Sequence, residues 1–349
     1  MATALPPAHA EISSAETRMT FLKSISGDIS PKSVRASQTG FVSAHNMMYR
    51  HSVTIYDAKT LELISTIQDR VDLTALGFTG YAGTHRGAPV EGAYSPDGSY
   101  LYVTNYAMYG NGFNREGTDN CKPADKYDHS FLYRINTSTW KIDAAYKVGT
   151  VPKVVAVSPD NKYILVSNWC SYDLSIISVA EQRVIKTIPI GAYPRGITIS
   201  KDSRFAYVAQ MGGNVVHRIS LGSWDRTTLA IGSNPRALVL SPDQKTLYAT
   251  LNKSGRVVAF DLDANKVVRS VRTGNAARSL DISTDGSSLF IVNFSSGTVS
   301  KVRTDDFSIL QNTKVCKEPI GVTYESQNKR VWVACYEGSI KVFADFPSQ

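Results

Sequence analysis

A chain of 349 residues, of which 42% are hydrophobic and 19% charged, is long enough to bury a large core and carries too little charge for a disordered protein. Its 18 Tyr and 12 Phe residues, with many Val, Ile and Thr, favour strands, and no window keeps a helical period beyond a turn or two. No apolar run approaches the roughly 18 to 20 residues that a membrane-spanning helix needs. We therefore expect an all-β protein with no membrane span, and a monomer.

Residues 1–16 are predicted to be a disordered tail or the remnant of a signal peptide. Ala8-His9-Ala10 before Glu11 resembles an A-x-A signal-peptidase site, although the charged and apolar regions that should precede such a site are absent. A disordered cytosolic tail is the alternative.

Residues 17–349 are predicted to form one domain built from a repeat, because one strand pattern recurs seven times. The copies are PKSVRAS from Pro31, PVEGAYS from Pro89, PKVVAVS from Pro152, PRGITIS from Pro194, PRALVLS from Pro235, ARSLDIS from Ala277 and PIGVTYE from Pro319. The last four intervals are 42, 41, 42 and 42 residues, whereas the first two are 58 and 63. Two insertions are therefore expected early in the chain.

Each copy continues through a turn, such as SPDG at 95–98, into three further strands. One four-stranded antiparallel sheet cannot bury both of its faces, but seven sheets arranged radially can, which predicts a seven-bladed β-propeller. The copy from Pro319 stops after its third strand, and the segment Thr17 to Ser26 alternates like the missing fourth strand. We expect this N-terminal strand to complete the last blade and close the ring.

The motif Tyr102-Val103-Thr104-Asn105, preceded by the SPDG turn, resembles the YVTN-repeat (YncE-like) seven-bladed propellers of bacterial envelopes and archaeal surface layers. The resemblance extends from residue 17 to about residue 345. It implies the propeller fold. For function it implies a wide range, since propellers of this appearance include nucleic-acid binders, surface proteins, lactonases and lyases.

Both insertions are predicted to lie on one face of the propeller. Because antiparallel strands alternate in direction, the start of strand one, the loop between strands two and three and the link to the next blade share a face. The 16-residue excess falls near 69–87, in a link between blades, and the 21-residue excess falls near 106–131, in a loop of the second blade. Loops on a rigid scaffold commonly carry function, so this face is the one where we expect a site.

The same face is predicted to carry cations and aromatic side chains. Directly after the first residue of five copies come Lys32, Lys153, Arg195, Arg236 and Arg278, and the residues at the ends of second strands include Tyr106, Asn168, Trp169, Phe294 and Tyr336. In a structural interpretation, Asn caps the strand and the aromatic rings pack between blades. In a functional interpretation, the cations attract an anionic ligand and the rings offer stacking surfaces.

The leading hypothesis is a non-catalytic, exported binding or scaffold propeller whose cationic, aromatic face holds an anionic small molecule, polymer or protein partner. Several like charges around one axis repel one another, and a negative ligand would offset that cost. A nucleic-acid-binding propeller is one alternative. It predicts an affinity that falls steeply with salt.

A metal-dependent, lactonase-like or lyase-like enzyme is the other alternative. His45, Glu91 and His129 are its candidate residues, because His and carboxylate groups serve both metal binding and acid/base catalysis. Other such residues in the first two blades are His51, Asp119, Asp125 and Asp128. No nucleophile or nucleotide-binding motif accompanies them. We expect no cofactor, with a divalent metal only in the enzyme alternative.

Four cysteines complete the set of candidate residues. Cys121 and Cys170 fall on the elaborated face of adjacent blades, and Cys316 and Cys335 fall on that face of the last blade. Four cysteines allow three pairings, so the sequence leaves the connectivity open. A bridge from Cys121 to Cys170 would hold the long loop over the channel mouth, whereas free thiols could bind metal, although no C-x-x-C spacing is present. Paired cysteines favour a periplasmic or extracellular protein.

Overall fold

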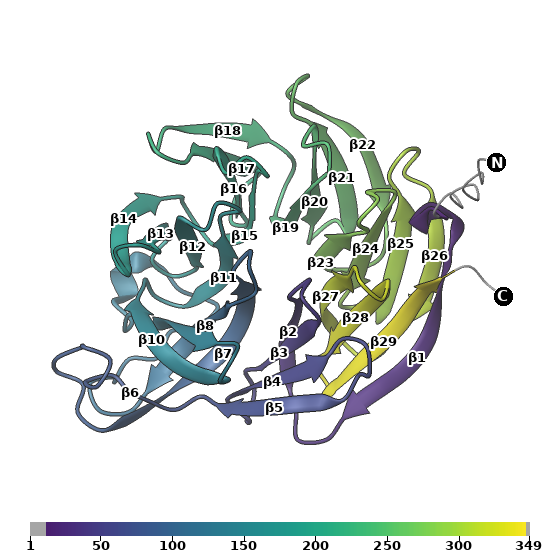
Figure 1. Cartoon of the computed structure of the whole chain (residues 1–349). Helices are drawn as coiled ribbons and strands as arrows, with labels where there is room; N and C mark the ends of the chain where they lie inside the picture. Colours follow the sequence, from purple (N-terminus) through teal and green to yellow (C-terminus); the bar gives the residue numbers. More distant parts are fainter. Residues whose placement is uncertain (1–11, 347–349) are drawn as a thin grey trace, which may run out of the picture.

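The computed structural model describes residues 12–346 and shows seven sheets arranged in a ring around a central channel (Figure 1). The A-x-A segment at 8–10 lies outside the described residues. Within residues 12–346, no helix has the length and apolar character needed to cross a membrane. The predicted all-β, seven-bladed propeller is confirmed.

The strands follow one another from the channel outward in each blade. Blades one to three are β2 Pro31–Ala36, β3 Phe41–Asn46, β4 Ser52–Asp57 and β5 Leu63–Gln68; β7 Thr84–Tyr94, β8 Tyr100–Tyr109, β9 Phe131–Asn136 and β10 Lys141–Lys147; and β11 Pro152–Val157, β12 Tyr163–Asn168, β13 Asp173–Ser178 and β14 Arg183–Pro189. Blades four to six are β15 Pro194–Ile199, β16 Phe205–Gln210, β17 Val215–Ser220 and β18 Arg226–Ala230; β19 Pro235–Leu240, β20 Thr246–Leu251, β21 Arg256–Asp261 and β22 Lys266–Arg272; and β23 Ala277–Ile282, β24 Ser288–Asn293, β25 Thr298–Arg303 and β26 Ile309–Lys314.

The seventh blade joins the two ends of the chain. It consists of β27 Pro319–Glu325, β28 Arg330–Cys335, β29 Ser339–Phe346 and the N-terminal β1 Arg18–Ser26, which pairs antiparallel with β29. The predicted closure by the N-terminal strand is therefore confirmed. Residues 14–16, which the sequence assigned to the tail, instead form a short 3-10 helix, η1 Ser14–Glu16, whose Ser14 hydroxyl donates to Asp345 at 2.6 Å.

The second blade departs from the expected four strands. A two-residue strand, β6 Val71–Asp72, from the first insertion pairs with the start of β7 and adds a fifth strand to that sheet. The second insertion begins as a continuation of β8 to Tyr109 and contains the short 3-10 helix η2 Pro123–Asp125 before β9 begins at Phe131. Both insertions therefore extend the elaborated face with backbone that is partly regular.

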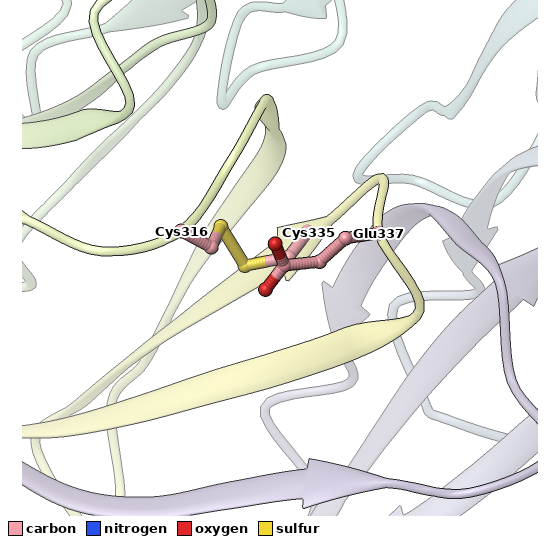
Figure 2. A group of neighbouring side chains, drawn as sticks. All are labelled: Cys316, Cys335 and Glu337. Atoms are coloured by element: carbon pink, nitrogen blue, oxygen red, sulfur yellow. A yellow bond between two sulfur atoms is a disulfide. The ribbon is translucent and has the colours of Figure 1, made fainter.

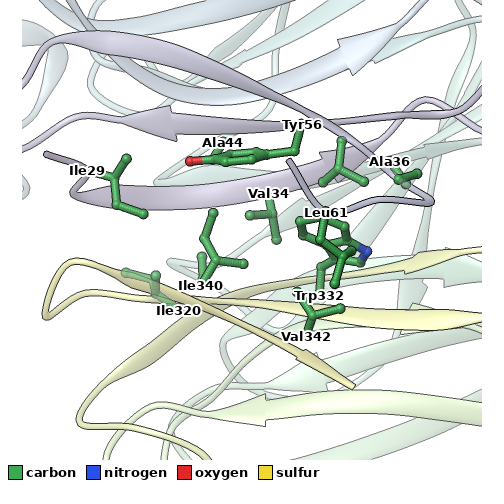
Figure 3. Packing of buried hydrophobic residues seen from close by; sticks show 13 residues of the cluster. Ile29, Val34, Ala36, Ala44, Tyr56, Leu61, Ile320, Trp332, Ile340 and Val342 are labelled. Carbon is green, nitrogen blue, oxygen red and sulfur yellow. The ribbon is translucent and has the colours of Figure 1, made fainter. Parts of the chain in front are cut away.

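The hydrophobic core lies between neighbouring blades. At the junction of the first and last blades, Val34 and Ala44 face Ile340, Val342 and the fully buried Trp332 (Figure 3). Equivalent clusters fill the other junctions, because each sheet buries its two faces against its neighbours. This packing makes the ring a rigid support for the side chains at its centre.

Candidate functional site

In five blades, the residue directly before the inner strand has the same left-handed backbone conformation. Val151, Tyr193, Asn234, Ala276 and Glu318, each directly before the first residue of its inner strand, all have a positive φ between 52° and 59°. In each inner strand the pairing with the second strand then shifts, as between Pro152 and Val155. Such bulges re-aim side chains, and here they accompany the position that carries the cations.

The inner strands enclose a cavity of about 500 Å³ along the axis. Arg195, Arg236, Arg278 and Glu91 line it at the end where the inner strands begin, and Gln38, Pro96 and Pro159 line it at the other end. Arg195 and Arg236 retain only 5% and 8% of their exposure. Guanidinium groups are thus held inside the mouth of the channel and not on its rim.

Lys32, Lys153, Arg195, Arg236 and Arg278 form what we call the cation ring. Burial, and then repulsion from Arg195, Arg236, Lys153 and Arg278, lowers the pKa of Lys32 well below its ordinary value. Burial followed by the neighbouring arginines likewise lowers the pKa of Arg236 and of Arg278. The five cations are therefore close enough to oppose one another's charge, as the repeat predicted.

Lys153 is the cation of the ring that the long insertion covers. Its Nζ lies 2.6 Å from Oδ1 of Asp119, 4.2 Å from the centre of the Tyr106 ring and 5.3 Å from that of Trp169. Burial lowers the pKa of Lys153 to about 7 even though Asp119 opposes the shift. Asp119 lies in an exposed loop. Its partial burial raises the pKa of its carboxyl, but the attraction of Lys153 lowers that pKa more strongly, to about 2.

The other cations have different partners. Arg195 Nη2 lies 3.4 Å from Glu91, whereas Arg236 Nη1 contacts the Met211 sulfur at 3.8 Å. The Arg278 guanidinium lies 3.7 Å from the centre of the Phe294 ring, and Lys32 Nζ lies 5.5 Å from that of Tyr336. In the described part of the chain, Lys32, Arg236 and Arg278 take part in no ion pair.

A disulfide between Cys121 and Cys170 ties the long insertion to the third blade. Around it, Trp169 Nε1 donates to the Asp119 carbonyl at 3.0 Å and the Tyr172 hydroxyl donates to the Cys121 carbonyl at 2.8 Å. Trp169 also stacks on Tyr193, with ring centres 4.5 Å apart. These contacts fix the segment that carries Asp119 over the mouth, so the insertion and the cation ring share one face, as predicted.

The second disulfide joins Cys316 to Cys335 in the last blade (Figure 2). Within residues 12–346, one group of three potential metal ligands lies close together, and it consists of these two cysteines and Glu337. Both sulfurs are used in the bridge, so no thiolate remains for a metal there. The two pairings are those that the sequence left as candidates.

Three predicted site residues form hydrogen bonds within the protein that give them a structural role. Asn168 is fully buried, and its amide donates to the side chains of Asp173 at 2.6 Å and Ser175 at 2.9 Å in β13, so it has a structural role through side chains and not through the loop backbone expected of a cap. His45 is also fully buried, beside Ser33, and burial followed by Arg35 lowers its pKa to about 3. His129 Nδ1 donates to the Val148 carbonyl at 2.8 Å.

The sequence did not reveal the partners of the ring. Glu91 and Asp119 were candidates for catalysis, but their contacts with Arg195 and Lys153 cross 104 and 34 residues. No periodicity relates such pairs, because Asp119 lies in a loop outside the repeat. Met211 follows the second strand of the fourth blade, at the position that Trp169 has in the third blade.

Two comparisons with known proteins each match part of the chain. Residues 222–331 match the family described as Lactonase, 7-bladed beta-propeller. Over 152 residues the chain is 28% identical to Antigen Lp49 of Leptospira interrogans serogroup Icterohaemorrhagiae serovar copenhageni (strain Fiocruz L1-130), and the aligned part covers 41% of this chain. The chain spans only 33% of the length of that relative. The family match supports the seven-bladed propeller.

Proposed function

We propose that this protein is a binding propeller whose cation ring holds an anionic ligand at the channel mouth. The observation that carries the proposal is that the buried Arg236 and the half-buried Arg278 lie inside the mouth without an ion pair to any carboxylate of the described chain. Burying such charges is unfavourable unless they are paired or hydrogen-bonded. An anionic ligand would supply the missing countercharge, and the Phe294 and Tyr336 rings would contact its less polar part.

Retention on phosphocellulose, a matrix of immobilised phosphate esters, tests this proposal. The variant R236A/R278A should elute at lower salt than wild type because it loses two cations of the mouth. The matched variant K266A/R269A removes two positive charges from the exposed outer strand β22 and should elute nearer to wild type. Equal shifts for the two variants would mean that retention follows net charge alone, and the proposal would fail.

The placement of the protein in the periplasm or outside the cell belongs to the same proposal. Two disulfides support it, because such bridges persist in oxidising compartments. The YVTN motif and the similarity of part of the chain to a leptospiral antigen agree with an envelope or surface protein of the YncE-like kind. Fractionation of cells that express the protein from its own gene would test this placement.

A lactonase-like enzyme is the second candidate, favoured by the family match over residues 222–331. Its site would be the same mouth, with Glu91 and Lys153 as ionisable groups near bound substrate. Two measurements test this candidate: metal analysis of the purified protein, and lactone hydrolysis with and without a chelator. Hydrolysis that E91Q abolishes would favour the enzyme over the binding protein.

A further inference from the structure

The cation ring is divided into two unequal halves. On the side of blades two to four, Lys153 pairs with Asp119 and Arg195 pairs with Glu91. On the side of blades five, six and one, Arg236, Arg278 and Lys32 contact a thioether or an aromatic ring instead of a carboxylate. We call these the compensated half and the open half.

The cations of the open half are held in place without being neutralised. Stacking on Phe294 fixes the plane of the Arg278 guanidinium and leaves its N–H groups free for an oxyanion. The buried Arg278 Nε has no hydrogen-bond partner, and neither has the buried Nη1 of Arg195, which lies at the border of the two halves. Buried polar groups are normally satisfied, so these atoms indicate a ligand that accepts from them.

The open half also has space beside it. A second cavity, of about 660 Å³, is lined by residues 294–297 and 314–318. Phe294 lines this second cavity, and its ring contacts Arg278, which lines the first cavity. Cys316, which the disulfide in Figure 2 joins to Cys335, also lines this second cavity. A ligand held by the open half can therefore extend sideways and need not enter the channel.

The balance of charge sets the class of ligand. Asp119 and Glu91 each pair with one cation of the ring, Lys153 and Arg195, so the three cations of the open half have no carboxylate partner in the described chain. We propose that the open half binds a small oxyanion with two or three negative charges, a phosphate compound or a polycarboxylate, and that Asp119 keeps such a ligand away from the compensated half. This inference rests on the proposed function and assigns that function to one part of the ring.

Calorimetric titration at constant ionic strength tests the charge class. Acetate, tricarballylate and pyrophosphate serve as probes with one carboxylate, three carboxylates and two phosphates. At least one multivalent probe should bind tenfold or more tightly than acetate, and the stronger of the two identifies the preferred oxyanion. Equal affinity for acetate, or no binding by any probe, would overturn the inference, whereas the phosphocellulose result would still decide the proposed function.

Two variants test the location. R236M/R278M should weaken binding of the preferred probe by tenfold to a hundredfold, since each charge-assisted hydrogen bond lost costs about one factor of ten or more. K153M/D119N removes a cation of the compensated half together with its carboxylate and should weaken binding less than R236M/R278M does. If R236M/R278M does not fold, R278M alone carries the comparison. Comparable losses in both variants would show that the ligand uses the whole ring.

Discussion

Lys153 and Asp119 connect the channel to the loop that covers it, with Lys153 Nζ 2.6 Å from the Asp119 carboxylate. Lys153 belongs to an inner strand and is 4% exposed, whereas Asp119 comes from the insertion that Cys121 ties to the third blade. A residue outside the repeat thus supplies the countercharge for a residue inside it. The ion pair therefore helps to hold the insertion that carries Asp119 over the channel mouth.

Replacing Asp119 should therefore destabilise the protein. Asp119→Asn leaves the buried Lys153 ammonium without its anion, and we expect a loss of about 1–3 kcal/mol, less than for a fully buried pair because Asp119 itself is exposed. Glu62→Gln, which breaks the exposed Lys23–Glu62 pair, should cost under about 1 kcal/mol. Urea unfolding of the two variants measures the difference. Equal losses of unfolding free energy would show that the Lys153–Asp119 pair stabilises the protein no more than an exposed surface pair does.

The depressed pKa of Lys153 predicts how stability depends on pH. Between about 7, its pKa in the folded state, and the ordinary value of 10.5, the unfolded chain binds one proton more than the folded chain. Stability therefore rises with pH in this window. The groups that face Lys153 are Asp119, Tyr106, Arg195 and Arg236.

The measurement compares wild type with Lys153→Met from pH 7 to 9. Wild type should gain about 1–3 kcal/mol of unfolding free energy relative to the variant over this range, since one pKa unit corresponds to about 1.4 kcal/mol. Parallel curves for the two proteins would mean that Lys153 titrates near its ordinary value.

The blade count, the ring closure and the shared face of cations and insertions could be predicted because each follows from a period or from strand alternation. The pairs Lys153–Asp119 and Arg195–Glu91 could not, since they depend on the path of loops and on contacts between blades. Asn168 shows another limit. An amide at a strand end suits both a structural role and a ligand contact, and only its bonds to the Asp173 and Ser175 side chains identify the structural role.

The two disulfides should contribute unequally to stability. Cys121 and Cys170 are 49 residues apart and Cys316 and Cys335 are 19 apart, so the first bridge restricts the unfolded chain more. We expect C121S/C170S to lose about 4 kcal/mol and C316S/C335S about 3 kcal/mol in urea unfolding. A reductant should lower the stability of wild type at least to that of C121S/C170S. No effect of reductant on wild type would contradict the presence of both bridges.

A buried cation, Lys301, connects the two ends of the chain at the ring closure. Replacing it should lower the free energy of unfolding more than breaking a surface ion pair does. Lys301 Nζ donates to the Thr17 carbonyl at 3.0 Å and to the Thr17 hydroxyl at 2.7 Å, and it lies 2.5 Å from Asp345, with both charged side chains fully buried. Lys301→Met leaves the Asp345 carboxylate buried without a cation, although Ser14 and Thr17 still donate to it. We expect a loss of about 3 kcal/mol, at the lower end for a broken buried pair.

Two further variants complete this test. K301M/D345N removes both charges and should recover part of the loss, because no buried charge then remains unpaired. Lys341→Met, on β29, the strand that carries Asp345, removes a cation whose exposed bond is to Ser24 and should change stability by less than about 0.5 kcal/mol. If K301M and K341M unfold at the same urea concentration, the cation at Lys301 does not stabilise the junction, and closure depends on the β1–β29 pairing alone.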